Sequence, residues 1–190
     1  MLFKIPFPSW ADKADLEVEI SDDVAPRFQM RAALSVVIGK AKEKGELADL
    51  SGTNLSGTNL NGANLNGTDL SDADLSDANL KFFKTDLWDV LLRSQPEIPA
   101  LLATLRAGKI DGSTYSGKCA CLAGTVAKTR HCSVDALGFA DNRRPIERWF
   151  LQLKPGHTPE NHGVAKITEA WILEFMGLVG MADTPNLELL

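Results

Sequence analysis

Leucine recurs at every fifth position from residue 50 to residue 80. The residue directly before each leucine is asparagine or aspartate, and the residue before that is alanine or threonine. A period of five fits neither the 3.6-residue period of a helix nor the two-residue alternation of a strand. It fits a chain that turns a corner every five residues and buries one large and one small side chain on each side.

The corner positions of this repeat segment, residues 46–80, hold mostly Ser, Gly, Asn and Asp, which turns favour for physical reasons. The segment resembles the pentapeptide-repeat family, whose consensus is Ala-(Asp/Asn)-Leu-x-x. The resemblance implies a right-handed quadrilateral β-helix with four pentapeptides per turn, so seven repeats give under two full turns. Residues 20 apart should then stack, which places Asp49 over Asp69, Asn54 over Asp74 and Asn59 over Asn79.

A solenoid this short cannot bury its core alone, because such cores form only by stacking and capping. We therefore expect an α+β fold in which the flanking segments cap the repeat. The predicted domains are an N-terminal strand and capping helix over residues 1–45, the solenoid over 46–87, and a helical C-terminal domain over 88–190. The solenoid is extended to residue 87 because Thr85-Asp86-Leu87 looks like one last repeat.

The N-terminal flank carries one strand pattern and one helix pattern. Residues 15–20 alternate acidic and apolar side chains, which is typical of a half-buried strand. Apolar residues at helical spacing predict a helix over 28–44, with N-cap candidates at 21–23 and Pro26 in its first turn. Gly45 suits the left-handed position that ends a helix.

The C-terminal half carries mainly helical patterns. Helices are expected over 86–93 with Thr85 as N-cap, from Pro96 to Ala107, over 118–128, and over 164–176. The stretch around Glu147 is compatible with either a helix or a strand. Large side chains expected in the core are Trp88, Trp149, Trp171 and Phe175.

Three phrases outside the repeat, at residues 81–90, 111–125 and 144–150, look like those of small pentapeptide-repeat proteins of phages and prophages. Those proteins pair a strand-helix start with a short repeat and a helical tail. The resemblance implies an origin in a mobile element, and it brings no catalytic residues with it.

The net charge of −5 is concentrated in the repeat segment, which has six acidic residues and no Lys or Arg. Direct binding of nucleic acid by this segment is therefore disfavoured, because phosphate contacts need basic side chains. The acids form a candidate protein-binding face, and the alternative is that they serve only solubility and turn formation. The predicted face consists of Asp49, Asp69, Asp72, Asp74 and Asp77.

A second candidate site is a structural zinc held by Cys119, Cys121, His131 and Cys132. The spacing argues against it, because Cys119 and Cys121 would lie about 200° apart on a helix. Cysteine and histidine could also pair as a nucleophile and base, but nothing beside either cysteine marks a nucleophile. No phosphate-binding, dinucleotide-binding or hydrolase motif is present. We therefore predict a protein that is not an enzyme and has no cofactor.

These observations predict a non-enzymatic protein-binding module, encoded by a phage or related element. It would inhibit a host nucleic-acid-handling or defence protein, such as a CRISPR effector, through its acidic surface. One alternative is a DNA mimic that modulates a topoisomerase (gyrase), as the quinolone-resistance pentapeptide proteins do; another is a small zinc-dependent or zinc-stabilised protein. The repeat is short for a long duplex mimic, although a homodimer would extend its surface.

The cysteine count, the N-terminal residues and the lengths of the apolar runs predict a cytoplasmic protein. The three cysteines are an odd number, which argues against a disulfide scaffold. The N-terminal residues lack the basic and apolar regions of a secretory signal, and no apolar run approaches the ~20 residues that span a bilayer. No membrane association is therefore expected.

Overall fold

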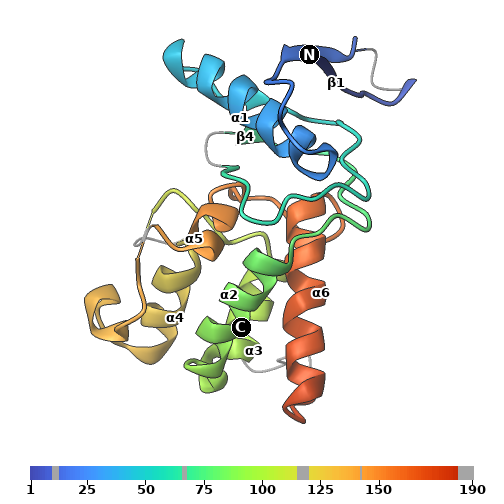
Figure 1. Ribbon diagram of the computed structural model, residues 1–190. Coiled ribbons are helices and arrows are strands. Elements are labelled where there is room, and N and C mark those ends of the chain that lie inside the picture. The colour runs from blue at the N-terminus through green and yellow to red at the C-terminus, as the bar shows by residue number, and fades with distance from the viewer. Residues whose placement is uncertain (10–12, 66–67, 115–119, 142, 184–190) are drawn as a thin grey trace. The chain divides into compact units, whose positions relative to one another are not determined.

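The computed structural model describes residues 1–9, 13–65, 68–114, 120–141 and 143–183 (Figure 1). The chain forms two compact units, Met1–Phe82 and Phe83–Leu190, which are described in turn. The first, the repeat unit, takes in both the N-terminal flank and the repeat segment. The second, the helical unit, takes in nearly all of the C-terminal half.

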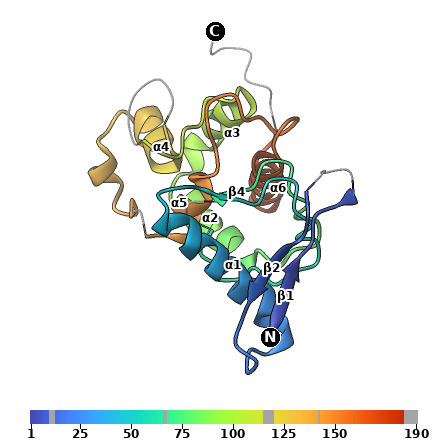
Figure 2. The same cartoon turned by 90° about the horizontal axis from the view of Figure 1, so that it is seen from above.

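The repeat unit begins with two antiparallel strands, β1 (Leu2–Ile5) and β2 (Leu16–Glu19), which lie side by side in Figure 2. Leu2 pairs with Glu19 at one end of the ladder. Val18 is buried while the glutamates on either side of it are exposed, as the alternating pattern predicts. The β2 prediction is confirmed, whereas β1 was not foreseen.

Helix α1 (Pro26–Glu43) packs its buried face against β1, β2 and the first repeat. Pro26 stands at the start, and Gly45 after the end has a φ of +73°. The prediction of an N-cap at residues 21–23 is wrong, because Ala25 is the N-cap and gives no side-chain bond. Pro26 fixes the helix start instead: it holds Ala25 extended and is itself pre-formed for the first turn.

In the repeat segment, the chain returns to the same place after 20 residues. β3 (Ala48–Asp49) pairs in parallel with β4 (Thr68–Asp69), and single bridges join Asn54 to Asp74 and Asn59 to Asn79. The predicted stacking is confirmed. These strands are two residues long at most, so the structure shows a series of short parallel pairings rather than extended sheet.

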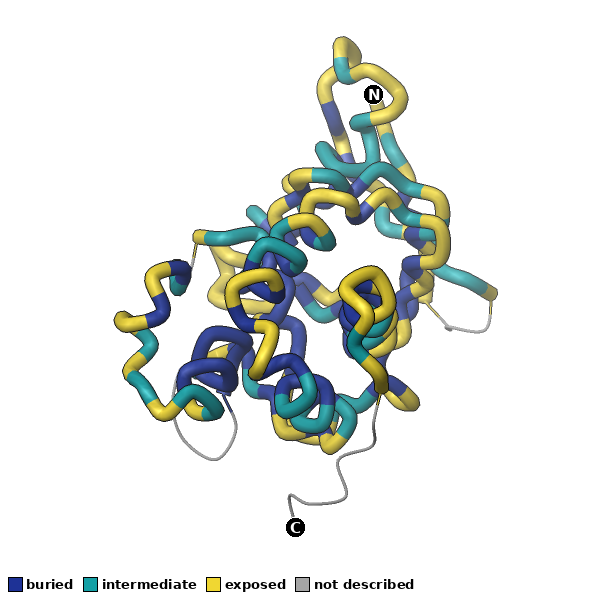
Figure 3. Tube along the Cα trace, turned by 90° about the horizontal axis from the view of Figure 1, so that it is seen from below, coloured by how far each residue is buried: buried dark blue, intermediate teal, exposed yellow. Residues whose placement is uncertain are grey.

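The repeated leucines form the core of this segment. All seven, at positions 50, 55, 60, 65, 70, 75 and 80, are at most 5% exposed. Figure 3 shows buried and exposed residues following each other closely along the segment. Two of the small side chains also stabilise the turns: the hydroxyls of Thr53 and Thr58 donate to the carbonyls three residues earlier, at 2.7 and 2.6 Å. The period-five pattern is thus a packing pattern.

We call residues 46–65 the first circuit of the repeat and residues 68–80 the second, because residues 20 apart pair. The segment after β1 pairs with the first circuit at the edge where a preceding circuit would otherwise lie. Within the repeat, the Asp74 N–H donates to the Thr53 carbonyl at 2.9 Å. The corresponding N–H of Asn54 donates instead to the Pro6 carbonyl, at 3.1 Å. This capping satisfies a backbone group that would otherwise end at an open edge.

The repeat ends earlier than predicted. Helix α2 spans Lys81–Leu92, so the predicted repeat at residues 85–87 and the N-cap at Thr85 are both wrong. The run 81–84 lacks the corner residues, and its apolar positions continue at helical spacing into Leu87, Val90 and Leu91. The side-chain carbonyls of Asn79 and Asn61 accept from the first two N–H groups of α2, at 3.3 and 2.9 Å.

The helical unit contains the rest of α2 and a series of mostly short helices. They are η2 (Gln95–Glu97), α3 (Ile98–Arg106), α4 (Leu122–Arg130), η3 (Val134–Leu137), α5 (Pro145–Phe150) and α6 (Gly163–Leu178). The helix predicted over 118–128 starts later, because Cys121 is the N-cap of α4, and Lys118 and Cys119 lie outside the described residues. The stretch around Glu147 is a helix. In the part of the chain that the structure describes, no helix is long and apolar enough to cross a membrane.

Aromatic side chains fill the core of the helical unit. The Trp149 ring is fully buried, and its centroid lies 5.2 Å from that of Phe83 and 5.3 Å from that of Trp171. Its indole N–H donates to the Thr168 hydroxyl at 2.9 Å, so the one polar atom of the ring is satisfied. The predicted core role of Trp149 and Trp171 is confirmed.

Candidate functional site

The acidic and amide side chains of the repeat hold its corners in shape. Asp49, Asn54, Asp69 and Asp74 each accept, through Oδ1, a hydrogen bond of 2.9–3.0 Å from the N–H of the serine two residues later. Three of those serines, 51, 56 and 71, also donate their hydroxyls to the same oxygen at 2.6 Å. We call this arrangement the Asx-x-Ser corner. It gives the Asx position a structural role that either Asp or Asn can fill.

The residue after each corner serine or asparagine needs a left-handed backbone. Gly52, Gly57 and Gly62 have φ values of 63–72°. Each follows a leucine by two residues in a four-residue turn, where a positive φ at the third position favours glycine. At the same place in the next circuit stand Asp72 and Asp77, with φ values of 57° and 55°. Two exposed carboxylates therefore occupy positions where the backbone prefers glycine.

Asp49, in the first circuit, is neutralised within the protein. The Lys13 ammonium lies 2.9 Å from both of its carboxylate oxygens. Hydrogen bonds from Ser51 and Lys13 lower the pKa of the Asp49 carboxyl below its usual range. The sequence did not indicate this pair, because the two residues are 36 positions apart and no local pattern connects them.

The acids of the second circuit have different neighbours. Asp74 is exposed and stacks under the neutral Asn54, and hydrogen bonds from Ser76 lower the pKa of its carboxyl. Asp69 is half-buried and stacks under Asp49, whose charge Lys13 compensates. Repulsion between stacked carboxylates, which destabilises facing strands, is reduced at both places. Asp72, Asp74 and Asp77, all exposed, form the acidic surface of the second circuit.

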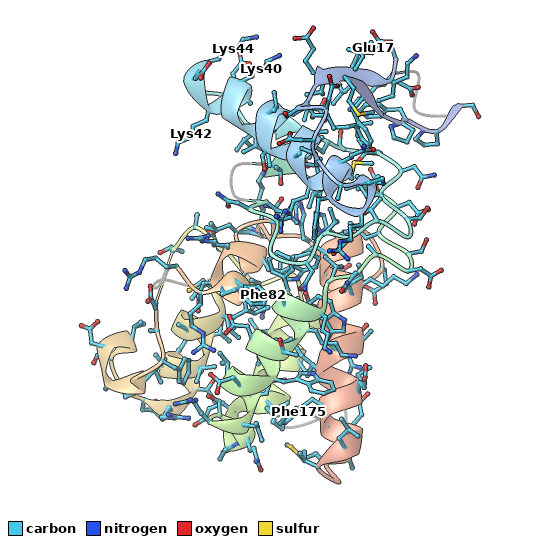
Figure 4. All side chains as sticks on the ribbon, viewed as in Figure 1. Glu17, Lys40, Lys42, Lys44, Phe82 and Phe175 are labelled. Carbon is cyan, nitrogen blue, oxygen red and sulfur yellow. The ribbon has the colours of Figure 1, made fainter. Side chains whose placement is uncertain are left out.

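Basic side chains in the repeat unit gather elsewhere. Lys40, Lys42 and Lys44 extend from the C-terminal end of α1 (Figure 4), where positive charge is favourable for the helix dipole. All three are exposed. Among the described residues, none of them pairs with an acid of the repeat segment. The acidic surface is thus available for a basic group from outside the unit.

The structure does not bring the candidate zinc ligands together. Cys121 is the N-cap of α4 and His131 is its left-handed C-cap, so the nine-residue helix, about 13 Å long, separates them. Cys119 lies outside the described residues, and Cys132 is half-buried next to His131. Within the described ranges, no group of three or more His, Cys, Asp or Glu side chains is placed to hold a metal ion.

Cys121 instead belongs to a buried pair with Glu147. Burial, reinforced by the nearby Glu147 charge, raises the pKa of the Cys121 thiol to about 12. Burial also raises the pKa of Glu147 to about 7, although its carboxylate accepts from the Ala123 N–H at 3.1 Å. A thiol that stays protonated is a poor nucleophile and a poor metal ligand. The pair caps the start of α4, because Cys121 Sγ accepts from the Gly124 N–H and Glu147 from the Ala123 N–H. No local pattern in the sequence indicates it, since α4 and α5 are separate elements of the chain.

The family model for pentapeptide repeats (8 copies) matches residues 47–81, within one residue at each end of the repeat segment. No curated protein matches the chain, and neither does any solved structure. A pentapeptide-repeat segment indicates a structural or protein-interaction module.

Proposed function

We propose that this chain is a non-enzymatic protein-binding module whose second repeat circuit binds a basic surface of a partner protein. The partner is a cytoplasmic host protein that handles nucleic acid or takes part in defence, and the module inhibits it on behalf of a phage or related element. This extends the interaction role that the repeat family indicates. We further propose that the repeat is a short right-handed quadrilateral β-helix, which the 20-residue pairing supports.

The observation that carries the proposal is the placement of Asp72 and Asp77. Glycine fills the equivalent left-handed corners of the first circuit, so aspartate there is unfavourable for the backbone. Strain of this kind is often kept where a side chain has a function. Both carboxylates are exposed, and in the described part of the chain neither has an ion-pair partner.

A basic partner fits this surface better than nucleic acid does. The repeat segment has no Lys or Arg, so phosphate groups would meet only like charge. Nucleic-acid-handling proteins carry basic surfaces, and complementary charge speeds their encounter with an acidic binder. The surface is small, which favours a local contact over imitation of a long duplex.

The test is capture of host proteins on the immobilised full chain, compared between three forms. Asp72→Asn with Asp77→Asn removes both charges while keeping residues that tolerate a left-handed backbone. Glu19→Gln with Glu43→Gln is the matched control, because it removes two exposed charges elsewhere in the repeat unit. We expect the control to retain the same host proteins as the wild type and the Asn variant to lose them. Equal retention by all three forms would contradict the proposal.

The gyrase alternative makes a separate prediction. A topoisomerase modulator should change DNA supercoiling by purified gyrase, and the Asn variant should not. If the wild type leaves supercoiling unchanged while host proteins are still captured, the partner is a protein other than gyrase.

A further inference from the structure

Asn61 takes the corner position that serine fills earlier in the first circuit. At Ser51 and Ser56 the hydroxyl donates to the Asx oxygen two residues earlier, at 2.6 Å. The Asn61 side chain instead contacts the start of α2, where its Oδ1 accepts from the Phe82 N–H at 2.9 Å. Its main-chain carbonyl accepts from Arg31 Nη1 at 3.3 Å. Both carbonyl groups of Asn61 are therefore hydrogen-bonded to donors from other segments.

The Gly62 nitrogen, directly after Asn61, differs from its counterparts in the first circuit. The Gly52 and Gly57 N–H groups donate to serine carbonyls of the second circuit, at 2.7 and 2.8 Å. The carbonyl at the same distance along the chain from Gly62 belongs to residue 81, which is the first residue of α2. Among the described residues, none accepts a hydrogen bond from the Gly62 N–H. Gly62 is exposed, so water and hydroxide can reach this nitrogen.

An asparagine that precedes a glycine can react with its own main chain. The nitrogen of the next residue attacks the side-chain carbon Cγ, and glycine leaves that nitrogen accessible because it has no Cβ. Attack makes Cγ tetrahedral and places negative charge on Oδ1. The Phe82 N–H already donates to this oxygen, and it belongs to the positive end of a 12-residue helix. A donor that is fixed where charge develops stabilises the transition state.

We propose that Asn61 is a self-modification site, where the start of α2 activates the Asn61 side-chain amide for attack by the Gly62 nitrogen. This nitrogen loses its proton to hydroxide and forms a bond with Cγ. The bond between Cγ and Nδ2 breaks, and the amide nitrogen takes a proton from water and leaves as ammonia. Water then opens the succinimide ring, at Cγ to give aspartate or at the main-chain carbonyl to give isoaspartate. The inference does not depend on the proposed function, because the reactants are this chain and water.

The position of the donor also predicts the main product. The Phe82 N–H favours attack of water at Cγ for the same reason that it favours attack of the nitrogen there, so aspartate should exceed isoaspartate. Aspartate keeps the main chain and places a carboxylate at the start of α2, where negative charge is favourable. Isoaspartate would insert a methylene group into the main chain and lengthen the corner. The modification should therefore add a negative charge to the repeat unit and preserve its fold.

The experiment incubates the full chain in mildly alkaline buffer and follows deamidation by mass spectrometry. Electron-transfer fragmentation locates each modified residue and distinguishes aspartate from isoaspartate. Phe82→Pro removes the donor N–H in the first helical turn, where proline is tolerated, and Phe82→Ala is the matched control that keeps this N–H. We expect Phe82→Pro to slow the deamidation of Asn61 about tenfold or more, and Phe82→Ala to match the wild type.

Unfolding the wild type in urea gives a second arm, which decides the question if Phe82→Pro does not fold. Urea separates Asn61 from α2, so deamidation there should be several-fold slower than in the folded chain and should give a larger share of isoaspartate. Asn66–Gly67 is the other Asn-Gly step in the sequence and lies outside the described residues. In urea it should react at the same rate as Asn61–Gly62, so it serves as the reference. The proposal is overturned if Asn61 reacts no faster in the folded chain than in urea, or if a folded Phe82→Pro variant reacts at the rate of Phe82→Ala.

Discussion

Side-chain hydrogen bonds in the repeat segment mostly join residues two or three apart, whereas most ion pairs in the helical unit join residues far apart in the chain. In the repeat, Ser71 bonds to Asp69 within a single corner. In the helical unit, Arg144 pairs with Asp86, 58 residues away, at 2.6 Å, and Arg106 pairs with Asp183, 77 residues away, at 2.9 Å. A corner in the repeat can therefore change without its neighbours. Each of these ion pairs in the helical unit instead joins two segments that are distant in the sequence, and the chain has no second copy of it.

This difference predicts where single substitutions do the most harm. The repeat offers several copies of each contact, so the loss of one leaves the rest intact. The long-range ion pairs of the helical unit are not repeated along the chain, so no second copy replaces one that is lost. The predictions that follow test this contrast, beginning with the largest effect.

Gly112 marks a place in the helical unit where two backbone segments almost touch. A Cβ atom built there would lie 1.9 Å from the Phe150 carbonyl oxygen, and the Gly112 N–H donates to the Leu153 carbonyl at 2.9 Å. Because backbone must shift to admit a methyl group, we expect Gly112→Ala to lower the free energy of unfolding of the helical unit by about 4 kcal/mol or more. Thermal unfolding followed by circular dichroism measures this.

Gly177, near the end of α6, is the matched control. A Cβ atom there meets nothing within 4 Å, so Gly177→Ala should be neutral or stabilise by up to about 1 kcal/mol. If the two variants unfold alike, the close approach at Gly112 does not constrain the fold.

The buried Glu147 predicts a pH dependence in the helical unit. Its folded pKa is raised to about 7 from 4.5, so its contribution to stability is complete below pH 4.5 and is lost as pH rises through 7. The loss amounts to about 3 kcal/mol at most. Glu147→Gln keeps an acceptor for the Ala123 N–H and should remove this dependence, so the variant should be the more stable protein at pH 8. Urea unfolding at several pH values between 4.5 and 8 measures the difference.

Glu97 predicts the opposite dependence of stability on pH and serves as the comparison. A hydrogen bond from Arg130 lowers the pKa of Glu97, so its contribution is present above the unfolded pKa and is lost as pH falls. Glu97→Gln should therefore destabilise the protein at neutral pH. The assignment of a raised pKa to Glu147 fails if both variants change stability in the same direction at pH 8.

The same contrast explains which features the sequence could predict. The stacking of Asp49, Asn54 and Asn59 over residues 20 positions later followed from a strict local period, because each corner is made by residues within five positions. The Lys13–Asp49 contact and the Cys121–Glu147 pair have no such pattern, since only the tertiary fold brings these residues together. The candidate acids were visible in the sequence, but the pairing of Asp49 with Lys13 and the exposure of Asp72, Asp74 and Asp77 were not.

The end of the repeat shows how a local pattern can mislead. Residues 85–87 match the repeat by residue type, yet they lie inside α2. The match is outweighed by the apolar face of the helix, which buries Phe83, Leu87 and Val90. Packing in the helical unit thus decides the structure of a segment that looks like the repeat.

The smallest effect is expected at the left-handed corners of the repeat. Asp72→Gly should stabilise the repeat unit by about 0.5–1 kcal/mol, because glycine takes a positive φ without the Cβ contact that aspartate makes. Gly57→Asp places the same strain in the first circuit, and no other atom lies within 4 Å of its Cβ position, so it should destabilise by a similar amount. Thermal unfolding of both variants gives the comparison. Because each corner is a separate local unit, the double variant should equal the sum of the two changes within about 0.5 kcal/mol. A much larger interaction energy would show that the corners of the repeat depend on one another, as the contacts of the helical unit do.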